Sequence, residues 1–139
     1  MPVEAVARVE RVDRVHAVDT LDTLNTLDAR LALAQGRPVT LLSAPGAALY
    51  AGCLWWQALI EAAETDSQHF LDCADAPGRA VEALKLGLPG IILSCEAALF
   101  TAVASIARAQ GALLLAAAPP ALDLAVRGAE RKLCAWLQA

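Results

Sequence analysis

Charge is the scarcest feature of this sequence. Of its 139 residues only 19% are charged, whereas 58% are hydrophobic, a composition that excludes a disordered chain. The basic residues are thinly spread and the net charge is −4, so the sequence lacks the basic patch that binds nucleic acid. A domain this small has much surface to cover with few charges. We therefore expect part of its apolar surface to be buried against a second copy, in a homodimer.

The sequence also lacks segments that would divide or export the chain. No Gly-rich, Ser-rich or charge-block linker is present, which predicts a single domain over 1–139, with an amino-terminal arm at 1–18 and a core at 19–139. The first residues alternate charges with valines instead of forming the apolar core of a signal peptide. We therefore expect a cytoplasmic protein.

Paired cysteines are missing as well. Four cysteines are widely spaced, with no C-x-x-C pair and no histidine at metal-ligand spacing: Cys53, Cys73, Cys95 and Cys134. We expect free thiols, no metal site and no cofactor. Small buried hydrophobic groups are the expected role of these cysteines.

One stretch is long and apolar enough to raise the question of a membrane span. No charged residue occurs from Pro38 to Ile60. Ser43, Pro45 and Gly46 interrupt this stretch, and Pro-Gly would break a spanning helix. A buried strand, a turn and a buried helix are the favoured interpretation, with a membrane helix as the alternative.

Regular helix stops organise the rest of the chain. Gly36, Gly87 and Gly111 each end a helix-like run and precede an apolar run. The predicted strands are 39–43, 69–73, 90–94 and 112–116, and the predicted helices are 46–64, 77–86, 96–110 and about 119–138. Near-continuous apolar strands are typical of a parallel sheet that helices cover on both faces. The sequence thus predicts a three-layer α/β/α domain of the doubly wound type, with a mainly parallel sheet of about four strands.

The amino-terminal region is harder to interpret. Apolar residues recur at every third position from Val3 to Leu27, a spacing that fits neither one straight helix nor a strand. Asp19 is a good N-cap for a helix over about 20–35. Residues 3–15 are then either a short strand or a helical arm, and the pattern does not decide between them.

The predicted helix 46–64 is apolar on every side, so little of it should contact water. Trp55 and Trp56 would point about 100° apart on this helix. If one ring lies against the sheet, the other meets a neighbouring element or a second subunit. The pair is therefore a candidate dimer interface, and packing within the core is the alternative.

Ligands of parallel α/β sheets bind beyond the carboxyl ends of the strands. That edge would carry two similar serine turns, L-L-S-A-P-G at 41–46 and I-L-S-C-E at 92–96, with D-C-A-D at 72–75 between them. The candidate ligand-binding residues are Ser43, Gly46, Asp72, Asp75 and Ser94. The S-A-P-G turn could cradle an anion, but it matches no phosphate-binding fingerprint, and a tight turn with a capping serine is the alternative.

Asp72 and Asp75 are the candidate catalytic residues. Asp72 ends an otherwise buried strand, where a carboxylate needs a partner or serves a site. The two carboxylates could also hold Mg²⁺ together with substrate phosphate oxygens. Alternatively, Asp72 stabilises a neighbouring turn, and Asp75, two residues before Pro77, caps the helix 77–86.

Complete catalytic constellations are absent from the sequence. Ser43 and Ser94 lack the G-x-S-x-G elbow, and His69 begins the strand that Cys73 ends, too far for a Cys-His pair. Two hypotheses follow. The favoured one is a non-enzymatic module that binds a small molecule or assembles into an oligomer; the alternative is a small enzyme that uses Asp72 with Asp75, Ser43 and Ser94.

Overall fold

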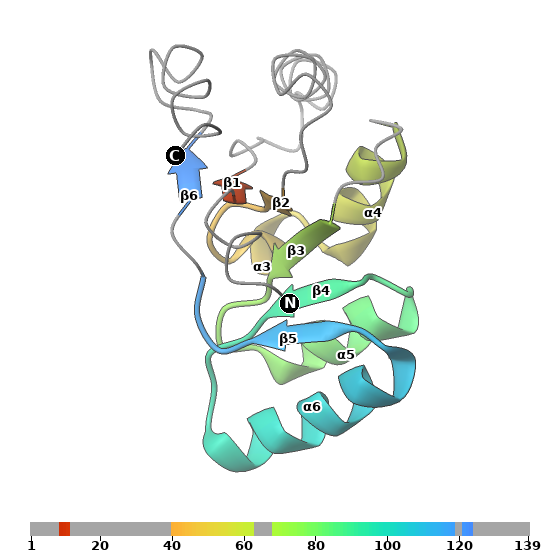
Figure 1. The fold of residues 1–139 in the computed structure, drawn as a ribbon, viewed down its shortest axis with the longest axis vertical. Coiled ribbons are helices and arrows are strands. Elements are labelled where there is room, and N and C mark those ends of the chain that lie inside the picture. Colours follow the sequence, from red (N-terminus) through yellow and green to blue (C-terminus); the bar gives the residue numbers. More distant parts are fainter. Residues whose placement is uncertain (1–8, 12–39, 63–67, 119–120, 124–139) are drawn as a thin grey trace.

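The structure, a computed structural model, describes residues 9–11, 40–62, 68–118 and 121–123. Within these ranges strands and helices alternate: β1 (Val9–Arg11), β2 (Thr40–Leu42), α3 (Ala47–Tyr50), α4 (Cys53–Ala62), β3 (Gln68–Asp72), α5 (Pro77–Lys85), β4 (Gly90–Ile92), α6 (Ala97–Gln110), β5 (Leu113–Leu115) and β6 (Ala121–Asp123). The strands of the described residues form one sheet in the order β5-β4-β3-β2-β1-β6, and every neighbouring pair is parallel (Figure 1).

The predicted α/β fold with a parallel sheet is confirmed. Each of the four predicted strands is present, and the glycine stops explain why the helices end where they do. Gly87 and Gly111 adopt left-handed backbone angles, with φ of 83° and 72°, directly after α5 and α6. Gly111 caps α6 by donating its N–H to the Ala107 and Arg108 carbonyls. The third predicted stop, Gly36, lies outside the described residues.

Side chains of the strands alternate between two cores. One core contains Leu41, Leu71 and Ile91 together with buried residues of α3, α4, α5 and α6. The other contains Leu42, Phe70 and Ile92, with Leu113 and Leu115 packed against them. All described helices therefore cover the same face of the sheet, as right-handed crossovers between successive neighbouring strands require. The helix predicted at 20–35 lies outside the described residues, so a helical layer on the second face stays a prediction.

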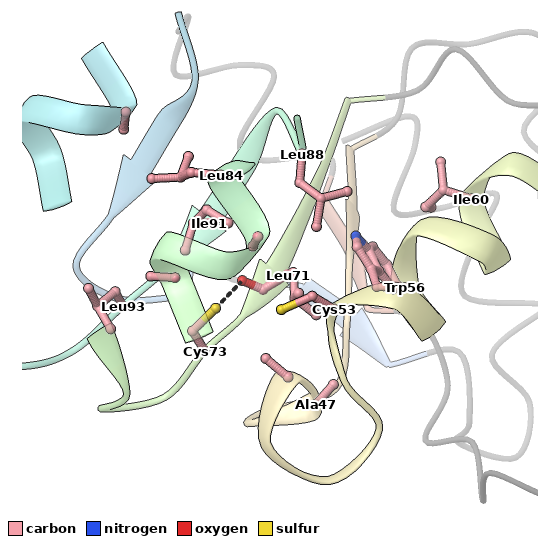
Figure 2. Close-up of a cluster of buried hydrophobic side chains, with 14 of the residues drawn as sticks. Ala47, Cys53, Trp56, Ile60, Leu71, Cys73, Leu84, Leu88, Ile91 and Leu93 are labelled. Carbon is pink, nitrogen blue, oxygen red and sulfur yellow. Dashed lines mark hydrogen bonds between the residues drawn. The ribbon is translucent and has the colours of Figure 1, made fainter. Parts of the chain in front are cut away.

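The larger core is built from both layers of the fold. Figure 2 shows Trp56 and Cys53 of α4 and Leu84 of α5 converging on Leu71 and Ile91 of the sheet. Trp56 and Leu71 are fully buried, and burial of such large apolar side chains contributes roughly 1.5–3 kcal/mol each. This core fixes the strands whose carboxyl ends carry the candidate site.

The helix predicted at 46–64 is interrupted, which corrects that prediction. The structure has α3 and α4 instead, separated at Ala51 and Gly52, and Gly52 adopts a φ of 92° that breaks the helix. The break also turns apolar side chains outward: Leu49 is 47% exposed and Leu54 is 64% exposed. The expectation that little of this segment contacts water was therefore wrong. A membrane helix over Pro38 to Ile60 is also excluded, since this stretch contains a strand and two separate helices.

The start of the last predicted helix, 119–138, was wrong, because its first residues include a strand. Residues Ala121–Asp123 form β6, which pairs in parallel with β1 at the far edge of the sheet, and residues 124–138 lie outside the described residues. At the other end of the chain, Val9–Arg11 form β1, so the described part of the arm is a strand. In the parts of the chain that the structure describes, no helix has the length and hydropathy of a membrane span.

Candidate functional site

The carboxyl ends of β2, β3 and β4 bring the candidate residues to one edge of the sheet. The Ser43 hydroxyl accepts a hydrogen bond from the Asp72 backbone N–H at 2.9 Å. Gly46 lies beside Ala74, because a Cβ built on Gly46 would be 3.9 Å from the Ala74 Cβ. The Ser94 N–H in turn donates to the Ala74 carbonyl at 2.8 Å. The turn at 72–75 therefore contacts both serine turns.

The Ser43 hydroxyl is occupied by the protein's own backbone. It is 3% exposed, it accepts from the Asp72 N–H, and it donates to the Ala44 carbonyl at 3.1 Å. Both its donor and one of its acceptor positions are thus used inside the fold. Ser43 joins the end of β2 to the end of β3.

Asp72 stabilises the turn that follows its own strand. Its Oδ1 accepts a hydrogen bond from the Ala74 N–H at 2.8 Å, which is the geometry of an Asx-turn. Ala74 has a φ of 51°, the left-handed conformation that alanine rarely adopts. The carboxylate therefore has a structural task, because it helps to hold Ala74 in this conformation. Of the two interpretations of Asp72, the geometry matches the turn.

Asp75 does not cap α5, which corrects the alternative proposed for it. The N-cap of α5 is Ala76, and no side chain makes the capping hydrogen bond. The reason is the preceding turn, in which the Ala76 N–H donates to the Cys73 carbonyl at 3.0 Å and leaves Asp75 at the exposed tip. Asp75 is the one exposed carboxylate of this turn.

Ser94 repeats the role of Ser43 on the next pair of strands. Its hydroxyl donates to the Ala116 carbonyl at 2.5 Å, so it joins the end of β4 to the end of β5. The similarity between the two serine turns thus has a structural explanation. Each serine ties its strand to the strand that follows in the chain.

Metal-ligating groups do not gather at this edge. In the ranges that the structure describes, no group of three or more His, Cys, Asp or Glu side chains could hold a metal ion. The nearest guanidinium in the sequence, that of Arg79, pairs instead with Glu82 at 2.8 Å on α5. Asp72 and Asp75 thus contribute two carboxylates, and the described part of the chain adds no third ligand of these residue types.

Two of the cysteines near the site, Cys53 and Cys73, are buried thiols. Burial, with a further contribution from the neighbouring Cys53, raises the pKa of the Cys73 thiol to about 12. Burial, with the negative charge of Glu82, also raises the pKa of Cys53. Their thiols donate to the carbonyls of Leu71 and Arg79 (Figure 2 draws the first of these). Since the thiolate is the reactive form, these raised pKa values disfavour a nucleophilic role for both thiols, and both are buried as predicted.

The tryptophan pair is split between core and periphery. Trp56 is fully buried and its Nε1–H donates to Nδ1 of His69 on β3 at 3.1 Å, so Trp56 is the ring of the pair that lies against the sheet. Trp55 is half-buried against Trp56, with 5.9 Å between ring centroids. Among the described residues its Nε1–H has no acceptor, and its role in an interface stays a prediction.

His69 is the buried polar residue that sequence reasoning did not assign. Burial lowers its pKa to about 4, so the ring is neutral at pH 7 and Nδ1 is free to accept from Trp56. The available signal was weak: a histidine at the start of an apolar strand, and a tryptophan on the preceding helix. The contact between the two residues depends on how α4 packs against β3, which the sequence alone does not give.

The strand order does not favour a crevice at these turns. Ligand crevices of α/β sheets open where successive connections leave in opposite directions. From β1 to β5 each strand lies next to the one before it, so the connections beyond β2, β3 and β4 all leave in the same direction. The direction in which the connections leave the sheet reverses only between β1 and β6, away from Ser43, Asp72 and Ser94.

Known proteins offer no match. Comparisons of the chain with protein-family models, with curated proteins and with solved structures find nothing similar.

Proposed function

We propose that this protein is a non-enzymatic assembly module that functions as a homo-oligomer. The observation that carries the proposal is the hydrogen bonding of the strand-end turns. The hydroxyls of Ser43 and Ser94 bond to the backbone at the end of the adjacent strand, and Asp72 bonds to the backbone of its own turn, so these candidate groups help to hold the sheet edge together.

The distribution of exposed apolar side chains also supports assembly. Large apolar residues are exposed on two helical regions of the described residues, Leu49, Tyr50 and Leu54 on α3 and α4, and Leu99 and Ile106 on α6. Exposed apolar side chains that gather on one face of a helix can form a protein–protein contact. Such a surface also agrees with a chain that is only 19% charged.

Two substitutions at Asp72 separate the structural role from a catalytic role. Asp72→Ala removes the acceptor for the Ala74 N–H and should lower the free energy of unfolding by about 1 kcal/mol. Asp72→Asn keeps a side-chain oxygen at that place and should lose much less. Urea unfolding of both variants measures these differences.

The same variants test the enzyme hypothesis. Thermal melts of the wild type, Asp72→Ala and Asp72→Asn are recorded with and without Mg²⁺ and a panel of phosphorylated and carboxylated metabolites. We expect no ligand-dependent shift in any of the three proteins. A compound that raises the wild-type melting temperature but has no effect on Asp72→Asn would instead favour the enzyme hypothesis.

A further inference from the structure

Among the residues that the structure describes, strand β5 has no neighbouring strand on one side of its backbone. It lies at the outer edge of the sheet, with β4 on one side only (Figure 1). The Leu113 N–H donates to the Pro89 carbonyl, and the Leu115 carbonyl accepts from the Leu93 N–H. Both residues therefore direct their backbone groups toward β4. Because direction alternates along a strand, the N–H and C=O of Leu114 point to the open side.

Natural proteins usually protect such an edge with charges, proline, bulges or a short strand, and of these β5 has its short length of three residues but no charge or proline. The stretch 111–118 reads G-A-L-L-L-A-A-A, without a charge or a proline. All three leucines of β5 are only half-buried. An uncharged, partly apolar edge with free backbone groups is a template for a further strand.

Helix α6 presents an apolar surface beside this edge. α6 packs against α5 and β5, burying Val103 and Ala107. Its outer side exposes Leu99 (46%) and Ile106 (38%), which lie two helical turns apart in one row. The exposed residues beside this row are small and uncharged: Ala98, Ala102, Ser105 and Ala109. They allow another helix to approach closely.

We propose that a second copy of this chain binds here, with β5 pairing antiparallel to β5 of the other copy about a two-fold axis at Leu114. This inference rests on the proposed assembly function and names its surface. At the axis the two Leu114 residues exchange both of their free backbone hydrogen bonds, and Leu113 faces Leu115. The same segment thus supplies every donor and acceptor that the other copy requires, as a two-fold interface demands.

The helices fit the same arrangement. α6 belongs to the crossover between β4 and β5, so across the axis the two α6 helices lie about two strand spacings apart, about 10 Å. This is a usual separation for packed helices. In an antiparallel helix pair, Leu99 of each copy lies opposite Ile106 of the other copy. The exposed apolar rows of the two α6 helices then bury each other.

The charges agree with self-association. Glu96 lies at the start of α6 and Arg108 in its last turn, with no charged residue between them. Antiparallel packing opposes the helix dipoles favourably. Arg108 is nine residues after Leu99 and so lies on the opposite side of α6, which leaves the exposed row itself without a charged side chain.

Amide hydrogen exchange tests the strand pairing without any substitution. The Leu113 and Leu115 amides lie on the β4 side and should be protected at every protein concentration. The Leu114 amide should exchange rapidly at low concentration and become protected as the dimer forms. Rapid exchange of Leu114 in a sample that sedimentation shows to be dimeric would overturn the β5 pairing.

Matched substitutions test the helix pairing. Leu99→Glu with Ile106→Glu places like charges across the axis and should weaken the dimer by about 100-fold or more. Ala97→Glu with Thr101→Glu makes a matched double change on the opposite side of α6, where both residues are exposed, and should leave the dimer intact. Circular dichroism of each variant verifies folding.

The outcomes separate this inference from the proposed function. A wild-type dimer that Leu99→Glu with Ile106→Glu leaves intact overturns the surface while the assembly function stands. A wild-type protein that stays monomeric at high concentration overturns both.

Discussion

Replacing Gly90 with alanine is expected to lower the free energy of unfolding by about 3 kcal/mol, because the new methyl group has no space. A Cβ at this position would lie 2.6 and 2.9 Å from two carbons of the Phe70 ring and would overlap the His69 carbonyl oxygen. The ring is fully buried and the carbonyl belongs to β3, so neither can move freely. Urea unfolding of Gly90→Ala and the wild type measures the loss.

Gly78→Ala is the matched control for this substitution. Gly78 lies in the first turn of α5, where a Cβ meets nothing within 4 Å. Alanine is a better helix former than glycine, so this variant should be as stable as the wild type or slightly more stable. Equal unfolding midpoints for Gly90→Ala and Gly78→Ala would contradict the close packing of β3 against β4.

Acid should destabilise the fold through His69. Its pKa is about 4 in the folded state, below the ordinary value of 6.5, because burial disfavours the charged ring. Between these values the unfolded chain binds more protons than the folded chain, so stability is full above pH 6.5 and falls as the pH drops toward 4. The loss is about 3 kcal/mol over this window. Protonation at Nδ1 would also break the hydrogen bond from Trp56.

The pH effect can be assigned to His69 by substitution. Urea unfolding is followed from pH 7 to pH 4.5 in a His16→Gln background, so that His69 is the remaining histidine. His69→Gln in that background should flatten the dependence of stability on pH, since glutamine does not titrate and can still accept from Trp56. The assignment fails if both proteins lose stability in parallel.

The elements that local signals specify were predictable. Gly87 and Gly111 stop α5 and α6 because the left-handed conformation after a helix strongly favours glycine. Gly52 also adopts a left-handed conformation and interrupts the helix between α3 and α4. It lies within an uninterrupted apolar run, so the sequence around it does not predict that the helix ends there. The strand at Ala121–Asp123 was mistaken for part of a helix because its pairing with β1 joins opposite ends of the sequence.

The candidate site was predictable in its location and only partly in its chemistry. Parallel strands must end at one edge, so Ser43, Asp72 and Ser94 could be placed together from the sequence. Their partners could not, because the Ser43–Asp72 bond joins different strands and depends on the strand order. The Asx-turn of Asp72 is a local bond, and it was foreseen as an alternative. The His69–Trp56 pair required the packing of α4 on the sheet.

Sedimentation equilibrium of the wild-type protein at pH 7, from low to high micromolar concentration, tests whether the chain associates with itself while its strand-end polar groups hold the fold together. The predicted result is a reversible rise from the monomer mass to the dimer mass with increasing concentration. A monomer mass at every concentration would contradict this self-association.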